Sequence, residues 1–417
     1  MEEAPSVEAV IQAVSSLYND PDPKVKEAAS KWLNQLQQSV WAWTISDQLL
    51  QRKLDENSCY FAAQTMRTKI QYSFQELPAE SHSSLRSSLM SHLTSLGPGT
   101  KQVILTQLCL AMADLVLLMS DWSSPVSELM SGLGPPLPHT SPLLEILVTL
   151  PEEVDSRTLR LGANRRQQVK EMLSSSSGQV THLLSSLLSC PGPESVRITC
   201  VKCYGSWLTL GVIPLDSVLA SPVMGFTVQA LQSPTSSSEL HEASTECMTA
   251  LLGRLEREEC QDLEVNTVRT VLQLANCYQT ALAEEDLEKC LNLCRIFTEL
   301  GESFLIKIVS SPPQQPHFSL EVLELVLLCC HHPDYELPDV TFNLWYRLSE
   351  ELYTRNDEAL TAVFKPQINK LIGSLARHCQ IEPDTVTQAG GGNERNNNKF
   401  YLRSESWRRE KTSQTSG

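Results

Sequence analysis

Apolar residues recur at helical spacing in several stretches of the chain. Between residues 25 and 36, apolar or small side chains fall three or four positions apart and form one stripe on a helix: Val25, Ala28, Ala29, Trp32, Leu33 and Leu36. Similar stripes run through residues 59–74, 287–297 and 342–352. Asp22 and Pro23 precede the first stripe, where an Asp can cap a helix and a Pro fits its first turn. Each stretch therefore predicts a helix with one buried face.

Short breakers separate these patterns. Ser236 and Glu239 are spaced as a capping box at the start of one helix. Two stretches look irregular: residues 120–142 predict a surface excursion between helices, and residues 388–417 predict a disordered Asn-, Gly- and Arg-rich tail. The breakers are Gly97-Pro98-Gly99, Leu150-Pro151, Pro191-Gly192-Pro193, Ser233-Pro234, Ser311-Pro312-Pro313 and His332-Pro333.

The composition favours an all-α protein. Hydrophobic residues make up 41% of the chain but aromatic residues only 6%, and alternating strand patterns bounded by turn signals are missing. Helix pairs of about 40–47 residues are typical of HEAT repeats, so the helical part has room for about nine pairs. The sequence thus predicts a HEAT-repeat α-solenoid. A globular helical bundle is the alternative, although a single core rarely grows beyond about 250–300 residues.

Charge, hydropathy and cysteine content indicate which partners and which cellular compartment to expect. The net charge is −16, although the predicted tail carries an excess of Lys and Arg. An acidic body repels nucleic acid and attracts basic proteins, or it serves only solubility. The apolar run from Val103 to Met119 contains Asp114 and is too short and polar to span a membrane. Thirteen scattered cysteines and an acidic amino terminus predict a reduced protein of the cytoplasm or nucleus.

Motifs for catalysis or metal binding are weak or missing. Cys200 and Cys203 form a lone CxxC, and their helical spacing favours thiols in the core over a zinc site. The run Cys329-Cys330-His331-His332 precedes Pro333, which suggests the end of a helix. Nucleophile-elbow, phosphate-loop, dinucleotide-binding and zinc-protease motifs do not occur. We therefore predict neither an enzyme, nor a metal site, nor a cofactor.

One segment concentrates positive charge on the acidic chain. Arg157, Arg160, Arg165 and Arg166 lie within ten residues. Guanidinium groups bind phosphate and carboxylate bidentately, so the segment is a candidate anion clamp. Alternatively, these arginines pair with acids of neighbouring repeats, such as Glu152 and Glu153.

Several segments resemble the importin-β family of nuclear import receptors. The stretch from Trp32 to Trp43 and the segment Cys59–Met66 are similar to the amino-terminal signature of that family. Four segments resemble, more narrowly, its transportin-SR branch, which imports serine/arginine-rich splicing factors: residues 58–66, 150–154 with 161–166, 294–300 and 376–380. The resemblance covers about residues 6–384 and implies import-receptor-like HEAT repeats at 1–95, further repeats of the same solenoid at 96–387, and the tail at 388–417.

The resemblance also implies partners. It implies that the early repeats bind Ran-GTP, that the partners of the full-length form include splicing-factor cargo and nucleoporins, and that the protein occurs in cytoplasm and nucleus. The second helix of each early repeat would present its polar side to the GTPase, and we predict contacts at Lys31, Gln35, Gln64 and Lys69. The cargo pocket would lie in a carboxy-terminal half missing here, so the chain is predicted to be a truncated receptor. A general HEAT scaffold without a GTPase partner is the alternative.

Overall fold

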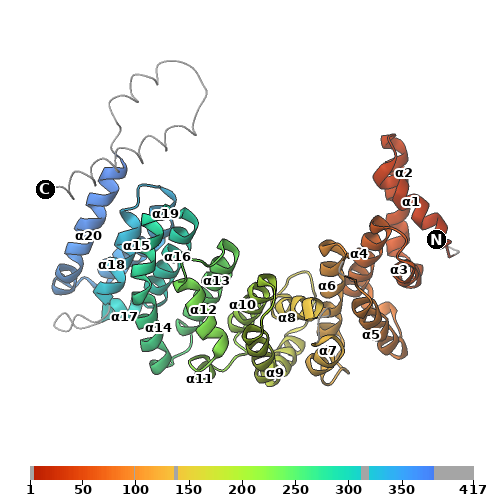
Figure 1. Ribbon diagram of the computed structural model, residues 1–417, viewed down its shortest axis with the longest axis horizontal. Coiled ribbons are helices and arrows are strands. Elements are labelled where there is room, and N and C mark those ends of the chain that lie inside the picture. Colours follow the sequence, from red (N-terminus) through yellow and green to blue (C-terminus); the bar gives the residue numbers. More distant parts are fainter. Residues whose placement is uncertain (1–3, 98, 136–139, 311–318, 380–417) are drawn as a thin grey trace, which may run out of the picture. The chain divides into compact units, whose positions relative to one another are not determined.

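Helices are the only regular elements in the residues that the structure describes. This computed structural model covers residues 4–97, 99–135, 140–310 and 319–379 (Figure 1). Internal contacts divide the chain into two compact units, which we call unit 1 (Met1–Ser217) and unit 2 (Val218–Gly417). The predicted tail at 388–417 lies outside the described residues.

Unit 1 is built from consecutive helices that pack as pairs. The pairs are α1 with α2, α3 with α4, α5 with α6, α7 with α8, and α9 with α10. The second helices of successive pairs also pack on one another, and we call α2, α4, α6, α8 and α10 the B row of unit 1. Its elements are α1 (Val7–Asn19), α2 (Pro23–Gln38), α3 (Trp41–Arg52), α4 (Glu56–Ser73), the 3-10 helix η1 (Phe74–Glu76), α5 (Ala79–Thr94), α6 (Gln102–Leu118), α7 (Pro125–Leu133), α8 (Thr140–Val154), α9 (Ala163–Ser189) and α10 (Glu194–Leu210), with the short α11 (Leu215–Val218) at the boundary.

Unit 2 repeats this plan. Helix α13 packs on α12 and α16, and α16 packs in turn on α15, α18 and α19. Its helices are α12 (Pro222–Gln232), α13 (Ser238–Leu255), α14 (Gln261–Gln273), α15 (Ala275–Ala283), α16 (Leu287–Ser303), α17 (Leu305–Ser310), α18 (Ser319–Cys330), α19 (Glu336–Arg355) and α20 (Glu358–His378). Paired helices stacked along the chain confirm the predicted HEAT-repeat α-solenoid. Within the described ranges, no helix is both long and apolar enough to cross a membrane.

The first predicted helix shows how periodicity and capping act together. The Asp22 carboxylate accepts a hydrogen bond from the Lys24 amide at 2.9 Å, and α2 begins at Pro23. The predicted stripe is buried at Ala29, Leu33 and Leu36. Val25, in the first turn, is exposed. The helix therefore forms where predicted, but its buried stripe is shorter.

Residues 120–142 are more ordered than the sequence analysis predicts. Helix α7 occupies Pro125–Leu133, so an irregular excursion over the whole segment is wrong. Pro125 stands in the first turn, and Val126, Leu129 and Leu133 are fully buried at helical spacing. This short apolar stripe stabilises the helix despite its Ser-, Gly- and Pro-rich surroundings.

The predicted capping box at the start of α13 is displaced by one residue. Ser237, not Ser236, accepts a hydrogen bond from the Leu240 amide.

The predicted break at Leu150-Pro151 does not occur, because Pro151 lies inside α8. A proline has no N–H, so Leu147, four residues earlier, loses its helical hydrogen-bond donor. Trp207 of α10 replaces that donor: its indole N–H bonds to the Leu147 carbonyl oxygen at 2.8 Å. The neighbouring Ser206 hydroxyl donates to the Val148 carbonyl at 2.8 Å. The two B-row helices thus meet at the proline, and α8 continues through it.

Candidate protein-binding surface

Three of the four predicted GTPase contacts lie on exposed positions of the B row. Lys31 and Gln35 are exposed on α2, and Gln64 is exposed on α4. Lys31 forms an ion pair with Glu27, one turn earlier, at 2.6 Å, and both side chains are largely in solvent. Such a surface pair contributes little to stability, so Lys31 is free to exchange Glu27 for a partner at little cost. These residues are accessible to a protein that docks on α2 and α4.

The prediction that Lys69 lies on the exposed polar face is wrong. Its side chain is only 2% exposed, and its ammonium pairs with Glu76 at 2.5 Å and lies 5.5 Å from the centre of the Trp43 ring. Helix α4 packs against α2, α3 and α6, so its buried arc is wider than a single stripe and includes residue 69. Lys69 therefore stabilises the contact of α4 with α3 and η1 and is not a surface contact.

A charged cluster that sequence reasoning missed joins three helices of the B row. Arg67 of α4 lies 3.6 Å from the Asp114 carboxylate of α6, measured from Nε, and 3.5 Å from the Glu153 carboxylate of α8, measured from Nη2. We call these three residues the B-row cluster. Asp114 is fully buried, whereas Arg67 and Glu153 reach the surface. The cluster thus connects a buried charge with the face that carries Gln64.

The charges within the B-row cluster do not balance, because one guanidinium lies near two carboxylates. Burial, together with the negative charge of Glu153, raises the pKa of Asp114 to about 7, although the guanidinium of Arg67 opposes this shift. One cation serves two carboxylates, so near neutral pH Asp114 alternates between charged and protonated forms. The sequence carried one signal for this residue: Asp114 is a charged position inside the apolar run of α6. Its partners come from other repeats, and spacing alone could not show them.

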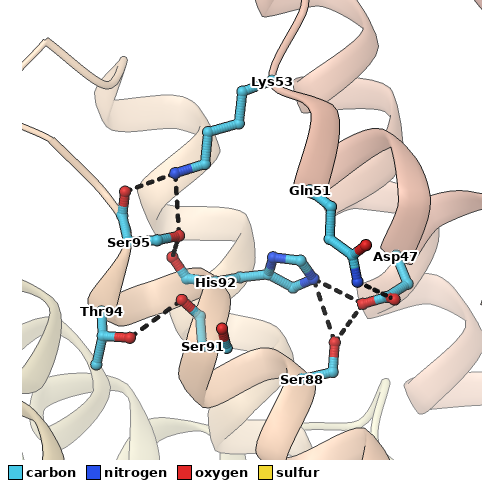
Figure 2. A network of polar contacts seen from close by, with 8 residues as sticks. All are labelled: Asp47, Gln51, Lys53, Ser88, Ser91, His92, Thr94 and Ser95. Atoms are coloured by element: carbon cyan, nitrogen blue, oxygen red, sulfur yellow. Dashed lines mark hydrogen bonds and ion pairs between the residues drawn. The ribbon is translucent and has the colours of Figure 1, made fainter.

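A second polar network joins the first helices of adjacent pairs, α3 and α5 (Figure 2). His92 Nε2 lies 2.8 Å from the Asp47 carboxylate, and Ser88 hydrogen-bonds to the same carboxylate oxygen. Lys53, which caps the carboxyl end of α3 in the left-handed conformation with φ 48°, donates to the carbonyl of Ser95 at 2.5 Å and to its hydroxyl at 3.0 Å. A cation at the carboxyl end of α5 also opposes the negative end of the helix dipole. This network fastens α3 to α5. Its residues come from these two helices and their carboxyl ends, so the network does not use the helices of the B row.

The candidate anion clamp is not formed by all four arginines. Arg165 of α9 donates to the carbonyl oxygens of Leu117 at 2.8 Å, Val116 at 3.2 Å and Met119 at 2.7 Å. It therefore satisfies the last carbonyls of α6. Arg157 and Arg160 are exposed in the α8–α9 connection, and Arg166 is half-buried. The alternative was that an arginine of this segment pairs with Glu153. The Glu153 carboxylate instead lies against Arg67 of α4.

Arg165→Met is expected to lower the free energy of unfolding of unit 1 by about 2 kcal/mol, because three carbonyls lose a charged donor. Hydrogen exchange in α6 and α9, measured on the intact chain, reports this loss. Arg160→Met is the matched control and is expected to change stability by less than about 0.5 kcal/mol, because its side chain is exposed. Equal protection in the two variants would contradict the capping role.

Thiols lie mostly in the helical core. Cys200 and Cys203 are buried, as their spacing predicted, and burial raises the pKa of both thiols. Cys190 and Cys379 are exposed. Helix α18 ends at Cys330, as Pro333 indicated. Across the described ranges, no three His, Cys, Asp or Glu side chains gather closely enough to hold a metal ion.

Three family models match successive, non-overlapping parts of the chain. They are described as the importin-beta N-terminal domain, which matches residues 29–95, an exportin 1-like protein, which matches residues 101–248, and the Transportin-3/Importin-13 second TPR domain, which matches residues 285–378. Importin-13 from Homo sapiens is 30% identical over 400 residues, and this similarity covers 91% of the chain. The chain belongs to the importin-β family. The resemblance inferred from the sequence is confirmed at this level.

The importin-β relatives are much longer than this chain. The chain spans 40% of the length of Importin-13 from Homo sapiens and likewise from Bos taurus, which is 30% identical over 396 residues. It spans 36% of Transportin MOS14 from Arabidopsis thaliana, which is 27% identical over 359 residues. The similarity to both an importin and a transportin does not single out the transportin-SR branch.

The importin-β matches coincide with the surface described above. The amino-terminal match at 29–95 runs from within α2 to the end of α5 and includes Lys31, Gln35, Gln64 and Arg67. The match at 101–248 contains α6 and α8, which supply Asp114 and Glu153. The B-row cluster therefore bridges the two matched regions.

Proposed function

We propose that this importin-β family chain acts in nuclear transport and binds Ran-GTP through its amino-terminal repeats. The observation that carries the proposal is the importin-beta N-terminal match at 29–95, which places that domain on α2 to α5. Exposed Lys31, Gln35 and Gln64 lie on its B-row helices and offer polar contacts to the GTPase. On this proposal the protein moves between cytoplasm and nucleus.

We extend the proposal to protein cargo and to nucleoporins, the proteins of the nuclear pore. Relatives named as an importin and a transportin support a receptor that carries protein cargo, and the transportin-SR resemblance points to serine/arginine-rich splicing factors. Nucleoporins are proposed as the further partners. Because the chain spans 40% of its importin relatives, these partners are proposed for the full-length form. The net charge of −16 favours basic partners over nucleic acid.

A nucleotide-selective binding experiment tests the GTPase proposal. The chain is expected to retain Ran loaded with GTP and to release Ran loaded with GDP in a pull-down at physiological salt. Equal retention of both forms would instead favour a general HEAT scaffold. Absence of binding to either form would overturn the proposal.

Charge reversal on α2 is expected to weaken this interaction. On this proposal Lys31 pairs with a carboxylate of the GTPase, so Lys31→Glu should reduce the affinity for Ran-GTP about fivefold or more by placing two like charges at the interface rim. Lys365→Glu is the matched control: it makes the same charge change at an exposed position of α20, in the other unit. Binding is measured by titration at two salt concentrations, since a true charge contact weakens as salt rises. Equal affinities of the two variants would exclude α2 from the contact.

A further inference from the structure

The B-row cluster contains one cation and two anions on three successive helices. Arg67 comes from α4, Asp114 from α6 and Glu153 from α8. When both carboxylates are ionised, the cluster carries one uncompensated negative charge. Burial makes such a charge costly unless a partner satisfies it.

The hydrogen bonds to the two carboxylates are few and long for groups with buried oxygens. Asp114 has no exposed surface, and neither of its side-chain oxygens makes a hydrogen bond of ordinary geometry. Glu153 Oε2 is likewise buried without one. Arg67 lies 3.6 Å from Asp114 and 3.5 Å from Glu153, so its guanidinium is shared between two carboxylates at distances too long for a good charged hydrogen bond to either. The side-chain amide of Gln71, also on α4, is a further hydrogen-bonding group at Asp114, and like Arg67 it opposes the rise in the pKa of this carboxyl.

Unit 2 contains a cluster of the same composition in a more exposed place. There Arg347 of α19 lies 3.5 Å from Glu302 and 3.7 Å from Glu256, again one cation between two acids. Those two carboxylates are 20% and 46% exposed, so water completes their solvation. Asp114 has no exposed surface, so the groups around it, and not bulk water, must satisfy its charge.

We propose that the B-row cluster is the docking site for one lysine or arginine side chain of a protein partner that binds the B row of unit 1. The incoming cation pairs with Glu153, whose side chain is 14% exposed. Arg67 is then released from Glu153 and closes on Asp114. Two ion pairs replace one shared guanidinium, and Asp114 gives up its proton.

The inference rests on the proposed function in one respect, namely that the B row is the surface on which the partner docks. The chemistry of the partner follows from charge: an acidic chain attracts basic proteins, and one positive side chain would balance the excess negative charge of the cluster. The proton of Asp114 provides a measurable sign of the proposed binding. Because the pKa of Asp114 is about 7, binding that requires the charged form must release a proton near neutral pH.

Proton linkage tests the site with Ran-GTP as partner. The affinity of the intact chain is expected to be about tenfold weaker at pH 6 than at pH 8, because most Asp114 side chains are protonated at the lower pH. Asp114→Asn and Glu153→Gln should each remove this difference. Glu145→Gln is the matched control: it removes a carboxylate from α8 two turns before Glu153 and should keep the difference. A wild-type pH dependence that persists in Asp114→Asn would overturn the proposal.

A small cation tests the site without the GTPase. The pKa of Asp114, followed by carboxyl-carbon NMR of the intact chain, is expected to fall by about half a unit or more in concentrated Nα-acetyl-argininamide. The citrulline analogue at the same ionic strength should leave it unchanged. A shift with the arginine compound but no Ran-GTP binding would uphold the cation site and refute the proposed partner. An identical Asp114 titration in both compounds would refute the cation site, whatever the GTPase does.

Discussion

Trp207→Ala is expected to lower the free energy of unfolding of unit 1 by about 3–5 kcal/mol, because it removes a large buried ring from between α8 and α10. Trp207 is 1% exposed, and its indole N–H is the donor that the Leu147 carbonyl lacks as a result of Pro151. Hydrogen exchange of α8 and α10 peptides in the intact chain measures the loss. Protection equal to that of the wild type would contradict the packing role.

The hydrogen bond can be separated from the bulk of the ring. Trp207→Phe keeps most of the volume and is expected to cost about 1–3 kcal/mol, since it leaves a buried carbonyl without a donor. In a Pro151→Ala background the alanine N–H can bond to the Leu147 carbonyl, so the same substitution should cost less. The double-mutant cycle measures this coupling. Additive effects would mean that Trp207 contributes through packing alone.

Lys69→Ala is expected to cost about 2–3 kcal/mol, mainly because it leaves a cavity beside Trp43, while the lost ion pair adds less because the Glu76 side chain is 35% exposed. Burial alone would raise the pKa of Glu76, but the hydrogen bond and charge of Lys69 hold this pKa below its usual value. The pair therefore contributes stability above the ordinary pKa of a glutamate, and this stability is lost as pH falls through the lowered value.

Chemical denaturation at pH 7 and at pH 3.5, with fluorescence as the probe, measures the Lys69 effect. The difference between wild type and Lys69→Ala should shrink at the lower pH as Glu76 becomes protonated. Lys31→Ala provides the control, because Lys31 forms only an exposed pair and its loss should cost less than about 0.5 kcal/mol. A similar loss of stability in both variants would refute a structural role for Lys69.

Local signals predicted the helices well and their partners poorly. The cap at Asp22 and the stripe of α2 could be read from the sequence because both depend on residues within one or two turns. Pro151 was misread as a break because its compensation comes from Trp207, more than fifty residues away in the sequence. The fold class follows from periodicity and composition, which are local properties.

The candidate surface was predicted only in part, for the same reason. Gln64 and Lys69 both lie between apolar positions of one helix, yet packing against several neighbours buries Lys69 and leaves Gln64 exposed. Asp114 was visible as a charge in an apolar run, but its relation to Arg67 and Glu153 depends on how three repeats stack. Arg165 was grouped with its sequence neighbours, whereas its donors reach the end of α6. Periodicity within one helix cannot report contacts between repeats.

The distribution of thiols has a practical consequence. Cys190 follows α9 in unit 1, Cys379 follows α20 in unit 2, and both are exposed. Thiolates are the reactive form of cysteine, and burial raises the pKa of core thiols such as Cys109 and Cys247. A maleimide dye or spin label in limiting amount therefore encounters these two sites before the core. The sequence thus provides one exposed thiol on each unit, in addition to the partly exposed Cys59, Cys260 and Cys277. With these three replaced, the separation of the units becomes accessible to energy transfer or dipolar spectroscopy.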